Sequence, residues 1–138
     1  MKPLNIITHP YLLIASFLLI LISGEQFGGF YALYLLLALP HGSTYALAAV
    51  VGIALLIYCR STRKKERWML SSLLNIVASA LLFTSLLLFF ENDTHGYNDG
   101  TFKQLVPQIT LALFGIISIL FIIYNLFPVF RKRIKQPT

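Results

Sequence analysis

The sequence predicts an all-α, polytopic membrane protein with four transmembrane helices and one short additional helix. Three observations predict this class. Of the 138 residues, 57% are hydrophobic and only 12% are charged, which is too apolar for a water-soluble globule of this size. The apolar residues are gathered into long runs. Ten of the eleven Lys and Arg residues lie beside these runs, at position 2 and within 60–67 and 131–135.

The first half of the chain, 4–59, is expected to form a helical hairpin with an extra segment at its turn. Residues 4–23 are long enough to cross a bilayer as a helix that Pro10 starts or kinks. Residues 43–59 make the second crossing. Residues 27–39 would rise only about 20 Å as a helix. We therefore expect 27–39 to be a re-entrant or interfacial helix on the outer side.

The second half, 68–130, is expected to form a hairpin of two transmembrane helices. Residues 68–90 and 107–127 are long, nearly uncharged runs, and each can span a hydrocarbon core of about 30 Å. The polar, turn-rich loop 91–106 joins them. The whole chain, 1–138, is thus predicted to be a single four-helix transmembrane domain that ends in a basic tail, 131–138.

The charge distribution predicts the orientation of the chain. Because short loops rich in Lys and Arg stay in the cytoplasm, both termini and the basic loop 60–67 should be cytoplasmic, in a cell (inner) membrane. The same side chains should bind anionic lipid head groups, at about 1 kcal/mol for each basic residue near the surface. Their position beside apolar runs argues against nucleic acid as a partner. These residues are Arg60, Arg63, Lys64, Lys65, Arg67, Arg131, Lys132 and Arg133.

A group of acidic and histidine side chains falls on the predicted outer side and is a candidate ligand or metal site. Carboxylates and imidazoles are common ligands of divalent metals. The alternative, which we favour, is a solvated loop whose acids follow the topology, because no established metal-binding spacing is present. The candidate residues are Glu25, His41, Glu91, Asp93 and His95.

Polar and small residues within the predicted spans are candidates for helix packing. In lipid, helices associate through small residues and through hydrogen bonds between polar side chains. Two arcs at helical spacing predict that 68–90 and 107–127 form the tightest helix pair. In this pair Ser79 is level with Ser118, Asn125 is level with the Ser72–Asn75 turn, and Gly115 lies in the seam. The packing candidates are Gly52, Ser72, Asn75, Ser79, Gly115, Ser118 and Asn125.

No residue pattern in the sequence names a reaction. A phosphate-binding loop, a nucleophile elbow and paired intramembrane carboxylates are all missing, so we expect no cofactor and no enzymatic activity. The leading hypothesis is an accessory, stabilising or regulatory subunit of a membrane assembly, with a protein partner or a second copy of the chain. The alternatives are a small self-associating channel or transporter, and an interface enzyme or metal-binding protein that uses the outer Glu/His group.

Overall fold

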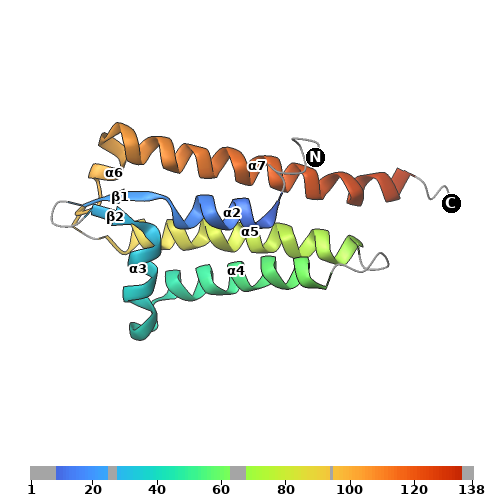
Figure 1. Cartoon of the computed structure of the whole chain (residues 1–138), viewed down its shortest axis with the longest axis horizontal. Coiled ribbons are helices and arrows are strands. Elements are labelled where there is room, and N and C mark those ends of the chain that lie inside the picture. Colours follow the sequence, from blue (N-terminus) through green and yellow to red (C-terminus); the bar gives the residue numbers. More distant parts are fainter. Residues whose placement is uncertain (1–8, 25–27, 63–67, 94, 135–138) are drawn as a thin grey trace.

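The computed structural model describes residues 9–24, 28–62, 68–93 and 95–134, and it is mostly helical. Three long helices, α4 (Thr44–Ser61), α5 (Trp68–Glu91) and α7 (Leu105–Ile134), lie side by side (Figure 1). Each contains a stretch that is long and apolar enough to cross a membrane, over Thr44–Ser61, Met69–Glu91 and Leu105–Leu126. The protein is therefore membrane-embedded, as its composition predicted, and its three best apolar runs form a helix bundle.

The helix predicted over 4–23, which Pro10 starts or kinks, ends earlier than expected. Helix α2 covers only Pro10–Leu18, a rise of about 14 Å, and the chain then becomes the short strand β1 (Leu21–Ser23). Pro10 occupies the first turn of α2, as expected, because a proline needs no N–H partner there. Residues 4–8 lie outside the described part of the chain.

Strand β1 pairs with a second short strand, β2 (Gly28–Phe30), so the fold is not strictly all-α. The two strands are antiparallel, with Leu21 opposite Phe30 and Ser23 opposite Gly28. This pairing gives hydrogen-bond partners to the backbone of Leu21–Ser23, which lies beyond the end of α2. Such satisfaction is required wherever irregular backbone enters an apolar layer.

The short helix predicted at 27–39 is present in part. Helix α3 runs over Tyr31–Ala38 and continues as the 3-10 turn η1 (Leu39–His41), while Phe27 lies outside the described residues. In Figure 1, α3 runs across the direction of α4, α5 and α7, at the end of the bundle where β1 and β2 lie. The turn ends at Gly42, whose φ of 66° is left-handed, a conformation that glycine adopts at little cost.

The prediction that α5 and α7 form the tightest pair is also wrong. The most extensive contact in the described structure is between α4 and α5, and α5 with α7 comes second. Helix α2 packs mainly on α7. The short helix α6 (Gly100–Lys103) precedes α7 and contacts β1.

Candidate functional site

The outer acids and histidines do not come together as a site in the described structure. No group of three or more His, Cys, Asp or Glu side chains is close enough to hold a metal ion among the residues that the structure describes. Glu25 lies outside that part of the chain, and Glu91 is exposed at the end of α5. The His41 ring nitrogen Nδ1 lies 3.0 Å from the carbonyl oxygen of Leu37, four residues earlier in the chain.

The other two members of this group organise the loop before α6. The Asp93 carboxylate accepts hydrogen bonds from the backbone N–H of Tyr97 (3.0 Å) and of Asn98 (2.6 Å). The exposed His95 ring packs edge-on against the Tyr97 ring. Asp93 therefore shapes a turn, as aspartates commonly do, and this geometry gives no support to catalysis.

The α5–α7 seam contains the polar pair that the two arcs predicted. The Asn75 side-chain N–H donates to Asn125 Oδ1 at 2.9 Å, and the Asn125 amide donates to the Phe121 carbonyl oxygen at 2.8 Å. The predicted pairing of Asn125 with the Ser72–Asn75 turn is thus confirmed, and Ser72 is also buried. The seam lies within α5 and α7 segments that can cross a membrane, where each such bond contributes about 0.6 kcal/mol, up to about 1.7.

The second predicted pairing, Ser79 with Ser118, is not a hydrogen bond. Both side chains are buried, but the Ser79 hydroxyl donates to the Asn75 carbonyl oxygen at 3.0 Å, one turn back along α5. Two buried oxygens of the seam, Asn75 Oδ1 and Ser118 Oγ, have no hydrogen-bond partner within the described structure. An unsatisfied buried group of this kind costs about 1–3 kcal/mol.

Gly115 does not permit the close approach predicted for it. In the described structure, a Cβ built at Gly115 meets no atom within 4 Å other than those of its chain neighbours and its own helix backbone. A Cβ built at Gly52 would lie 2.9 Å from Leu82 Cδ2 and 3.1 Å from the Ala78 carbonyl oxygen. Gly52 is therefore the position where two backbones meet, between α4 and α5. Gly52, one of the predicted packing residues, thus has the role that was also predicted for Gly115.

The sequence reasoning missed a fully buried tyrosine that ties the crosswise helix to the bundle. The Tyr31 hydroxyl donates to the Ser85 carbonyl oxygen at 3.1 Å and lies 2.9 Å from the Ser85 hydroxyl oxygen. Its ring packs edge-on against Phe17 and Phe89, at centroid distances of 5.2 Å. Burial raises the pKa of Tyr31 and the Ser85 hydrogen bond lowers it in part, so the phenol stays protonated and can donate.

The sequence analysis also did not identify two threonines that hold strand β1 in place. The backbone N–H of Ser23 donates to Thr101 Oγ1 at 2.9 Å, and that of Leu21 donates to Thr110 Oγ1 at 3.0 Å. A Cβ at Gly100 would lie only 2.6 Å from the Ser23 carbonyl oxygen, so a glycine is needed there. A polar residue in an apolar run is the one sequence signal that could have pointed to Thr110.

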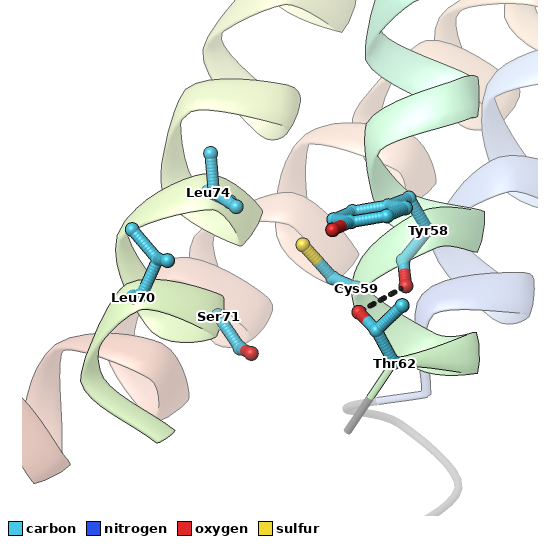
Figure 2. A pocket seen from close by; sticks show the side chains of 6 residues that line it. All are labelled: Tyr58, Cys59, Thr62, Leu70, Ser71 and Leu74. Atoms are coloured by element: carbon cyan, nitrogen blue, oxygen red, sulfur yellow. Dashed lines mark hydrogen bonds between the residues drawn. The ribbon is translucent and has the colours of Figure 1, made fainter. Parts of the chain in front are cut away.

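A small pocket lies where α4 ends and α5 begins. Figure 2 shows the Cys59 thiol directed towards α5, and the Thr62 hydroxyl bonded to the Tyr58 carbonyl oxygen at 2.8 Å. The pocket volume is about 30 Å³, close to the volume of one water molecule in the liquid. Ligand sites for metabolites are about ten times larger or more. The lining residues are Tyr58, Cys59, Thr62, Leu70, Ser71 and Leu74.

The basic residues predicted to contact lipid head groups are described only in part. Arg60 is exposed in the last turn of α4. Residues 63–67 fall outside the described structure, while Arg131, Lys132 and Arg133 belong to the last turns of α7. The last turns of α4 and of α7 lie at the same end of the bundle (Figure 1).

Comparison with known proteins does not assign the chain to a family. No protein-family model, no curated protein and no solved structure matches the chain.

Proposed function

We propose that this chain is a non-enzymatic, multi-pass membrane protein that acts through contacts inside the bilayer, as an accessory, stabilising or regulatory subunit of a membrane assembly. One observation carries the proposal: several buried and half-buried polar side chains bind the chain's own elements together. Asn75 joins α5 to α7, Tyr31 joins α3 to α5, and Thr110 joins α7 to β1. The outward faces of the long helices are apolar, and such surfaces bind lipid or another membrane helix.

The proposed topology places both termini and the loop 60–67 in the cytoplasm, with 25–42 and 91–106 outside. It rests on the positive-inside rule. In this arrangement residues 4–23 make a fourth passage, of which α2 is the outer part. This is consistent with the contacts of α2: the Phe17 ring lies 5.4 Å from Phe114, ten residues into α7, which is about 14 Å along that helix.

Cysteine labelling tests the topology in a background in which Cys59 is replaced by Ala. In intact cells, an impermeant maleimide should react with the variant Asn98→Cys and not with Ser61→Cys until the membrane is opened. The reverse labelling pattern would overturn the orientation. Asn92→Cys, in the same outer loop as Asn98, is a matched positive control.

Photo-crosslinking in the native membrane tests the proposed function. A photoreactive residue at Leu47 or Leu113, both about half exposed on apolar faces, should give one defined protein adduct. The same residue at the fully buried Leu82 should give none. Lipid adducts alone at every exposed position of α4, α5 and α7 would contradict a role through protein contacts.

A small self-associating channel or carrier is the second candidate. The two unpaired oxygens of the α5–α7 seam, Asn75 Oδ1 and Ser118 Oγ, favour it, because a permeating polar species would need such acceptors. Purified protein in liposomes should then conduct ions or small solutes above the level of empty liposomes. No flux above that level would exclude this candidate and leave the contact function standing.

A further inference from the structure

Helix α3 has one face buried against the protein and an opposite face that is largely exposed in the described structure. Tyr31, Leu35 and Ala38 are at most 6% exposed and face the bundle. On the opposite side, Leu33, Leu36 and Leu37 are 53%, 63% and 72% exposed. A helix that is apolar all round belongs in an apolar environment, so the exposed leucines require a cover.

The contacts of α3 with α5 give its depth relative to the end of the bundle. Tyr31 is bonded to Ser85, six residues before the exposed Glu91 at which α5 ends, which is about 9 Å along the helix axis. The Tyr34 ring packs on Phe89, at 5.3 Å, two residues or about 3 Å from Glu91. Helix α3 thus lies about 3–9 Å inside the charged end of α5.

The orientation and charge of α3 identify the cover as lipid. Because α3 runs across the direction of the long helices (Figure 1), it lies along the plane of the membrane that they cross. Residues 28–40 contain no charged side chain. Interfacial helices bury their apolar face about 5–10 Å into the boundary between head groups and acyl chains, which agrees with this depth.

The length of α4 gives an independent reason for lipid at this level. Its 18 residues rise about 27 Å, slightly less than a hydrocarbon core of about 30 Å. Helix α3 joins α4 at this outer end, where the Ser43 N–H donates to the Ala38 carbonyl oxygen at 3.4 Å. The leucine face of α3 extends the apolar surface beside the short helix.

We propose that α3 lies flat in the outer leaflet, with Leu33, Leu36 and Leu37 in contact with lipid acyl chains near the head groups. The inference rests on the proposed membrane topology and deepens it by naming the partner of this face. It chooses the interface-lying arrangement over a re-entrant helix, because α3 turns along the membrane plane and does not point towards its centre.

Fluorescence quenching tests the proposal in proteoliposomes made from the full chain. In a background with Trp68→Phe, the single tryptophan of Leu36→Trp should be quenched several-fold more by lipids brominated near the head group than by aqueous iodide. Leu113→Trp, on the exposed face of α7, is the control for insertion and should be quenched by lipids brominated deeper in the chain. Tyr97→Trp, in the outer loop, should be quenched by iodide.

Each other outcome overturns the proposal in a recognisable way. A Leu36→Trp response equal to that of Tyr97→Trp would place α3 in water. Protection from both quenchers would mean that protein covers this face, either a second copy of the chain or another subunit. Quenching of Leu113→Trp by iodide and not by bromolipid would instead refute membrane insertion of α7, and with it the proposed topology.

Discussion

The two faces of α5 pack against their neighbours in different ways. Against α4 the contact depends on a glycine: a Cβ at Gly52 would meet Leu82 Cδ2 at 2.9 Å and the Ala78 carbonyl oxygen at 3.1 Å. Against α7 the contact includes the Asn75–Asn125 hydrogen bond and leaves two buried oxygens unpaired. The α4–α5 contact is nevertheless the larger one. The larger contact of α5 is thus the one in which the helix backbones approach closely at a glycine, an arrangement common between helices in lipid.

Gly52→Leu should have the largest effect on stability. The new side chain would collide with the Ala78 backbone oxygen, which cannot move aside as a side-chain end can, so α4 and α5 must separate. Overpacking of this kind costs about 1–3 kcal/mol or more, and we expect a clear fall in the midpoint of thermal unfolding in detergent.

Gly115→Leu is the matched control, because the same change is made where nothing lies within 4 Å. It should alter the free energy of unfolding by no more than about 0.5 kcal/mol. Equal losses at the two glycines would remove the distinction between the seams.

Tyr31→Phe should have the next largest effect. It removes the hydroxyl that bonds to Ser85 and leaves a fully buried serine without that partner, at a cost of about 1–3 kcal/mol. The loss should appear as faster proteolysis within 21–41 as well as a lower unfolding midpoint. Tyr58→Phe, at a half-exposed tyrosine, should change neither.

The long helices could be predicted from the sequence because their signals are local. An apolar run of sufficient length is visible in one window, and α4, α5 and α7 follow the predicted spans to within a few residues at most of their ends. The Asn75–Asn125 pair could also be predicted from the sequence. Helical periodicity places the two residues on facing arcs, and counting from the basic segments places them at the same depth along the two helices.

The β1–β2 strand pair and the roles of the two glycines could not be predicted from local patterns. The Ser23 N–H bonds to a threonine that is 78 residues away in the sequence, and the Leu21 N–H bonds to one that is 89 residues away. No local sequence pattern predicts partners at such separations. Gly52 and Gly115 both sit in apolar helices, and only the positions of the neighbouring helices decide which of them meets another backbone.

Asn75→Leu should lower stability moderately. It removes the donor to Asn125 Oδ1 and leaves that oxygen in an apolar seam, so we expect a loss of about 0.6 to 1.7 kcal/mol. The double variant Asn75→Leu with Asn125→Leu should be no less stable than the single one, because both partners are then removed together. A double variant that loses the sum of the two single effects would show that the pair is not coupled.

Ser118→Ala should have the smallest effect, and in the opposite direction. The hydroxyl is fully buried and has no hydrogen-bond partner in the described structure, so its removal relieves a desolvation cost and should stabilise the protein by up to about 1 kcal/mol. Ser79→Ala is the control on the facing helix: it removes a bond to the Asn75 carbonyl oxygen and should be neutral or slightly destabilising. If Ser118→Ala instead lowers the unfolding midpoint, the hydroxyl binds something that the chain itself does not provide. A polar species would then occupy the α5–α7 seam, and the channel or carrier would become the stronger of the two functions.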